Sequence, residues 1–67
     1  MAKQYGYFSM VDVEHVLTLR LYDAKDYVLA KMNSHEKFDK RNRDKLEKLV
    51  DSAMDIDTLA FGLNSFF

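Results

Sequence analysis

Apolar residues recur at helical spacing in VEHVLTLRLYDAKDYVLAKM, residues 13–32. Side chains three or four residues apart lie on one face of an α-helix. Ser9, with Asp12 three residues later, forms a capping-box pattern that marks a helix start. The pattern predicts one helix over about residues 10–33, preceded by an irregular lead-in at 1–8. Its core-facing stripe comprises Leu17, Leu21, Ala24 and Val28.

The same stretch has more apolar residues than one helix face holds. Leu19, Tyr22 and Leu29 fall on the opposite side of the predicted helix. We expect this second stripe to face another chain, or to lie beneath the lead-in and the C-terminal tail. Residues 16–22 also alternate as a strand would, so helix and strand both stay open there. The helix is favoured because DAKDYVLAKM continues with helix formers and without Gly or Pro.

Two more helices are predicted after a break at Asn33-Ser34. Ser34 can cap a helix over about residues 35–54, and Asp55 or Asp57 can cap a short one over about 57–66. The inward face of the longer of these two helices is expected to carry Phe38, Asn42, Leu46, Leu49, Val50 and Ala53.

The predicted fold class is therefore all-α. An antiparallel helical hairpin, 10–33 and 35–54, is crossed by a short C-terminal helix, and residues 1–67 form a single domain.

Size and composition change the expectation about partners. A chain of 67 residues, 48% hydrophobic and without Cys, has a small core and no disulfide to stabilise it. The remaining way to stabilise so small a core is association with other chains. We expect either a homo-oligomer or binding to a larger protein. No apolar run approaches the roughly 20 residues of a membrane span, and the first ten residues lack a signal-peptide pattern. We expect a cytoplasmic, intracellular location.

The aromatic residues near both ends are candidates for an interface, because Tyr is favoured at binding hot spots. The alternative is that they cover the hairpin as an apolar lid. Together with the second stripe, the candidate protein-interface residues are Leu19, Tyr22, Leu29, Tyr5, Tyr7, Phe8, Phe66 and Phe67.

The basic stretch EKFDKRNRDKLEK, residues 36–48, suggests an alternative function. It contains six basic and four acidic residues, which leaves a net charge of +2. The acids fall at helical pair spacings, Glu36–Lys40, Asp39–Arg43 and Asp44–Lys48, and the whole chain has a net charge of -1. A solvated helix face is therefore favoured over a nucleic-acid site. Candidate phosphate contacts under the nucleic-acid alternative are Lys37, Lys40, Arg41, Arg43 and Lys45.

Catalytic and metal-binding motifs do not emerge from the sequence. His15 and His35 lack the paired ligands of a zinc site, and DSAMDID lacks the Gly and closing Glu of an EF-hand loop. We expect no enzyme activity, metal or cofactor. The predicted function is a protein-interaction module that regulates or inhibits a larger protein or self-associates through its first helix, a form shared by phage-encoded inhibitors. A DNA- or RNA-binding regulator and a structural subunit of an assembly are the alternatives.

Overall fold

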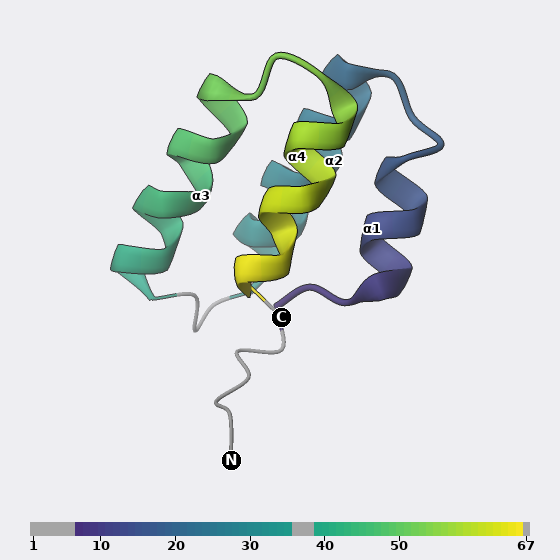
Figure 1. Cartoon of the computed structure of the whole chain (residues 1–67). Helices are drawn as coiled ribbons and strands as arrows, with labels where there is room; N and C mark the ends of the chain where they lie inside the picture. The colour runs from purple at the N-terminus through teal and green to yellow at the C-terminus, as the bar shows by residue number, and fades with distance from the viewer. Residues whose placement is uncertain (1–6, 36–38, 67) are drawn as a thin grey trace.

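The computed structural model of this protein describes residues 7–35 and 39–66 (Figure 1). Within these two ranges, four α-helices follow one another: α1 (Met10–Val16), α2 (Leu21–Ser34), α3 (Lys40–Ser52) and α4 (Ile56–Gly62). A short 3-10 helix, η1 (Leu63–Phe66), continues α4. Within the described ranges there is no strand, so the all-α prediction is confirmed and residues 16–22 do not form one.

The prediction of one unbroken helix over 10–33 is wrong in its middle. α1 ends at Val16, and residues 17–20 turn the chain before α2 begins. The turn tightens through backbone bonds of the 3-10 type, in which the N–H groups of Thr18 and Leu19 each donate to the carbonyl three residues earlier, both at 3.0 Å. The Thr18 hydroxyl also donates to the His15 carbonyl at 2.6 Å, which offers that carbonyl a partner outside the helical ladder.

Folding back at this turn explains the surplus of apolar residues. A straight helix would hold Leu19 and Leu29 on the side facing away from the hairpin. In the structure both are half-buried against the core, and Val16 is fully buried. Leu17, predicted to face the second helix, is instead 48% exposed. The chain thus buries most of both stripes without a second copy.

The helical hairpin consists of α2 and α3, which pack against each other and run in opposite directions (Figure 1). Asp39 is the N-cap residue of α3, so that helix begins five residues later than predicted. Ser34 does not cap it, because Ser34 ends α2 and its hydroxyl donates to the Lys31 carbonyl at 2.7 Å. Phe38, predicted on the inward face, lies outside the described residues.

α4 packs across the other helices and contacts α1, α2 and α3. Its start is fixed by Asp55, whose carboxylate accepts a hydrogen bond from the Thr58 N–H at 2.8 Å. Its last residue, Gly62, lies against α3, where a Cβ atom would overlap the side chain of Leu49. The absence of a side chain at position 62 therefore permits close packing of α4 on α3.

The core is closed where the two ends of the described chain meet. The Phe8 N–H donates to the Phe66 carbonyl at 3.3 Å, and the two rings pack edge to face with centroids 6.4 Å apart. Every helix contributes to this core. Its buried apolar residues are Phe8, Val16, Ala24, Val28, Met32, Leu46, Val50, Ala53, Leu59, Ala60, Leu63 and Phe66.

Candidate interaction surfaces

The most heavily bonded polar side chain is that of Asp12, which is 3% exposed. Its Oδ2 accepts from the Ser9 N–H at 2.9 Å, which confirms the reciprocal half of the predicted capping box. Its Oδ1 accepts from the Tyr27 hydroxyl at 2.7 Å and from the Lys31 ammonium at 2.6 Å. Since Tyr27 and Lys31 are one turn apart on α2, this carboxylate ties α1 to α2.

These hydrogen bonds favour the ionised form of the Asp12 carboxyl. Burial alone would raise the pKa of Asp12, but the hydrogen bonds from Lys31, Tyr27 and Ser9 and the Lys31 charge outweigh it and lower the pKa. Donation to a carboxylate, together with partial burial, raises the pKa of Tyr27 to about 12. The buried charge is thus paired and hydrogen-bonded, as a structural carboxylate must be.

The surroundings of this cluster are also packed. The His15 ring lies on the Tyr27 ring with centroids 4.7 Å apart, and the Lys31 ammonium lies 6.0 Å from the centroid of the Phe8 ring. Asp12 therefore holds the fold together and presents no free carboxylate to a substrate. Among the residues described, no group of three or more His, Cys, Asp or Glu is arranged to hold a metal ion.

The structure distributes the predicted interface residues between core and surface. Phe8 and Phe66 are buried, which corresponds to the apolar lid weighed as the alternative. Leu19, Leu29 and Tyr7 are half-buried against the core. Tyr22 stands out at 79% exposure. Tyr5 and Phe67 lie outside the described residues.

Exposed apolar residues that the sequence reasoning missed lie on α1 or directly after it, in the α3–α4 connection and on α4. Met10 is 57% exposed, Val11 72% and Leu17 48%. Met10, the first residue of α1, and Leu17, directly after its end, are seven residues apart and so share one side of the helix. Val11 is also exposed, about 100° round the helix from Met10. The seven-residue spacing of Met10 and Leu17 can be read from the sequence. It was not recognised as a surface pattern because Leu17 was predicted to face the core. Met54 in the α3–α4 connection and Phe61 on α4 are also exposed.

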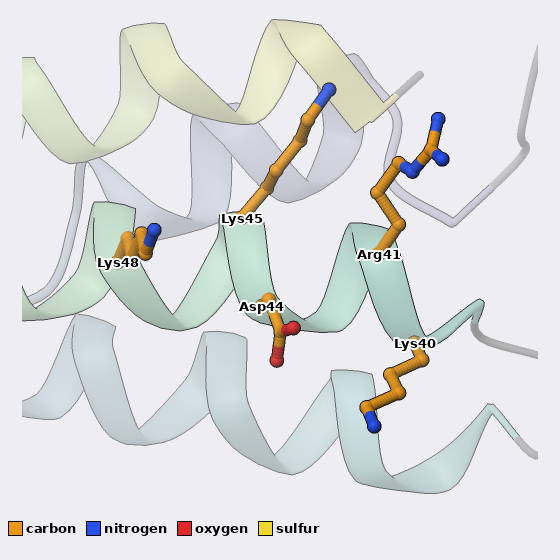
Figure 2. Close-up of a pocket in the computed structure, with 5 residues that line it drawn as sticks. All are labelled: Lys40, Arg41, Asp44, Lys45 and Lys48. Atoms are coloured by element: carbon orange, nitrogen blue, oxygen red, sulfur yellow. The ribbon is translucent and has the colours of Figure 1, made fainter.

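A separate surface lies on the outer side of α3, where five side chains line an open hollow of about 410 Å³. Figure 2 shows these side chains as sticks. Arg41 and Lys45 extend toward α4, whereas Lys40 and Asp44 extend toward α2 (Figure 2). We call this surface the α3 basic face; its residues are Lys40, Arg41, Asp44, Lys45 and Lys48.

The α3 basic face contains three of the five candidate nucleic-acid residues. Arg43 is not among them, because its guanidinium donates to the Asn33 side-chain carbonyl at 3.2 Å, and Lys37 lies outside the described residues. The expected pairs Asp39–Arg43 and Asp44–Lys48 are not within ion-pair distance in the described chain, where Asp12 and Lys31 form the ion pair. Lys48, which the nucleic-acid candidates omitted, joins the face one turn after Asp44.

No described helix combines the length and the apolar character needed to cross a membrane. Comparison of the chain with models of known protein families, with curated proteins and with solved structures finds no match. Functional inference therefore rests on the surfaces described above.

Proposed function

We propose that this protein is a non-enzymatic protein-interaction module, a regulator or inhibitor that binds a larger protein through the exposed side of α1. The observation that carries the proposal is the exposure of Met10 and Val11 on α1 and of Leu17 directly after it. Clustered exposed apolar side chains, unlike scattered ones, are typical of interfaces.

The energetics support this use of α1. Fully burying a side chain of this kind contributes about 1.5–3 kcal/mol, so three partly exposed ones contribute several kcal/mol to association. The geometry is also favourable, because the Asp12 cluster fixes α1 on α2 before any partner arrives. A pre-ordered helix loses little conformational freedom on binding.

Tyr22 is the predicted interface residue that retains this role in the proposal. It lies in the first turn of α2, directly after the connection that begins at Leu17, and it is 79% exposed. Its ring supplies apolar area and its hydroxyl a hydrogen-bonding group, the combination that is enriched at interfaces. A second copy of this chain is the alternative occupant of the same surface.

The experiment compares partner capture by two variants. Leu17→Lys places a charge on the α1 surface, and Met54→Lys places the same charge on an exposed residue of the α3–α4 connection. Tagged wild-type and variant proteins are used for affinity purification from the native host, with quantitative mass spectrometry, after circular dichroism has confirmed that each is folded.

The expected result is a stoichiometric partner that is recovered with wild type and Met54→Lys but lost with Leu17→Lys. Light scattering over a range of concentrations reports a second copy on the same surface. A protein that remains monomeric, and whose recovered proteins are unaffected by Leu17→Lys, would contradict the proposal.

A further inference from the structure

The α3 basic face carries a cluster of cations that the fold itself does not use. Lys40, Arg41, Lys45 and Lys48 are all exposed, and none forms an ion pair within the described ranges. They span nine residues of helix, and the eight rises of 1.5 Å between the first and the last give a length of about 12 Å. The hollow between their side chains is open to solvent.

The position of two of these cations works against the stability of α3. Lys40 and Arg41 open the helix directly after the N-cap residue Asp39, and the first turn itself has no acidic residue. The amino end of a helix has a partial positive charge, so cations there are unfavourable and acids are preferred. Residues that oppose a local rule without a compensating contact in the fold point to function.

The carboxylate of Asp44 distinguishes between two kinds of anionic partner for the α3 basic face, nucleic acid and an acidic protein segment. It lies among the four cations and extends toward α2, on the same side of α3 as Lys40 (Figure 2). A nucleic-acid backbone presents phosphates alone and would meet this carboxylate with repulsion. An acidic protein segment can place carboxylates against the cations and one basic side chain against Asp44.

From these observations we infer that the α3 basic face docks an acidic segment of a partner protein, with one basic residue among its carboxylates. The inference is independent of the function proposed for α1, since α3 and α1 lie at opposite edges of the molecule with α2 and α4 between them (Figure 1).

The test measures binding of three fluorescent probes by anisotropy at low and at high salt. The first probe is a short Glu-rich peptide with a single central Lys. The second is a peptide of the same length and net charge without Lys, and the third is a single-stranded oligonucleotide of matched net charge. We expect the Lys-containing peptide to bind most tightly, and its affinity to fall as salt screens the charges.

Two sets of variants, each with its own control, assign the binding to the face. Lys45→Glu and Lys48→Glu should each weaken binding of the Lys-containing peptide by about tenfold, whereas Arg20→Glu, the same charge change at an exposed position outside the face, should leave it within about twofold. Asp44→Asn should abolish the preference for the Lys-containing peptide, while Asp51→Asn should preserve it.

Each contrary result overturns the inference. Tighter binding of the oligonucleotide would assign the face to nucleic acid. Equal binding of the two peptides, or equal losses in Arg20→Glu and Lys45→Glu, would show that attraction to this chain is not localised on the α3 basic face. Absence of binding by every probe at low salt would leave the cations as a solvated helix face.

Discussion

The hydroxyl of Tyr27 donates a 2.7 Å hydrogen bond to the buried carboxylate of Asp12, fifteen residues earlier in the chain. This bond joins α1 to α2 across the turn that interrupts the predicted long helix. Because α1 is only two turns long, it cannot be stable by propensity alone and depends on such tertiary contacts.

Removal of the Tyr27 hydroxyl should destabilise the fold. A hydrogen bond to a charged group contributes about 1.5–3 kcal/mol, and Asp12 keeps its other donors, so Tyr27→Phe should lower the free energy of unfolding by about 1.5 kcal/mol. Urea denaturation measures the change. Tyr22→Phe is the matched control, and because Tyr22 is 79% exposed its effect should be close to zero. Equal effects in the two variants would contradict a structural role for the Tyr27 hydroxyl.

Stability should fall on the acid side through Asp12. Its pKa is lower in the folded protein than the ordinary value of 3.8. The folded state therefore binds the Asp12 proton less tightly than the unfolded state does. The stability that the ionised carboxylate contributes is fully present above pH 3.8 and is lost as the pH falls through the lower pKa of the folded protein. Asp12→Asn should reduce this pH dependence in urea titrations. Asp55, whose pKa is lowered by hydrogen bonds at the α4 N-cap, also reduces folding stability as the pH falls. This contribution remains in Asp12→Asn.

Folding stability should also decrease at alkaline pH, and there the responsible group is Tyr27. Its pKa is raised from 10.0 to about 12 in the folded protein. The stability associated with the neutral phenol is present below pH 10 and is lost as the pH rises from 10 through about 12. The ultraviolet absorbance of phenolate should show a component titrating at about 12 that Tyr27→Phe removes. An unchanged titration in that variant would show that the late component belongs to another tyrosine.

Gly62→Ala should destabilise the protein, although helix propensity alone argues for stabilisation. Ala is favoured over Gly within a helix by about 1 kcal/mol. At position 62, however, the new Cβ overlaps the side chain of Leu49, and overpacking typically costs about 1–3 kcal/mol. The control is to make Gly62→Ala in a protein that already carries Leu49→Ala. Because the overlapping side chain is then shortened, Gly62→Ala should be neutral or stabilising there. Additive effects in the double variant would exclude this contact as the cause.

Charges at Leu19 or Leu29 should unfold the monomer before they affect any association. Both side chains are half-buried against the core. Leu29→Asp buries part of a charge and removes apolar packing, so the free energy of unfolding should decrease by about 2 kcal/mol or more. Denaturation and light scattering on the same samples separate the two effects. A folded variant with altered association would show that the second stripe is an interface after all.

The sequence alone was sufficient for the helical class, the hairpin and several helix ends. Asp55 caps α4 and Asp12 closes a capping box with Ser9, because these interactions join residues three positions apart. Local rules of this kind need no knowledge of distant neighbours. The inward face of α3, with Leu46 and Val50 buried, likewise follows from spacing within one helix.

The tertiary structure decided which apolar residues are covered. Residues 17–20 contain no Gly or Pro, so nothing local marks the turn that buries Leu19 and exposes Leu17. That turn forms because a 67-residue chain lowers its free energy by burying most of both stripes in one core, with Asp12, Tyr27 and Lys31 fixing the returning helix. Helical periodicity predicts the faces of each helix, whereas the choice between core and surface depends on contacts between residues far apart in the chain.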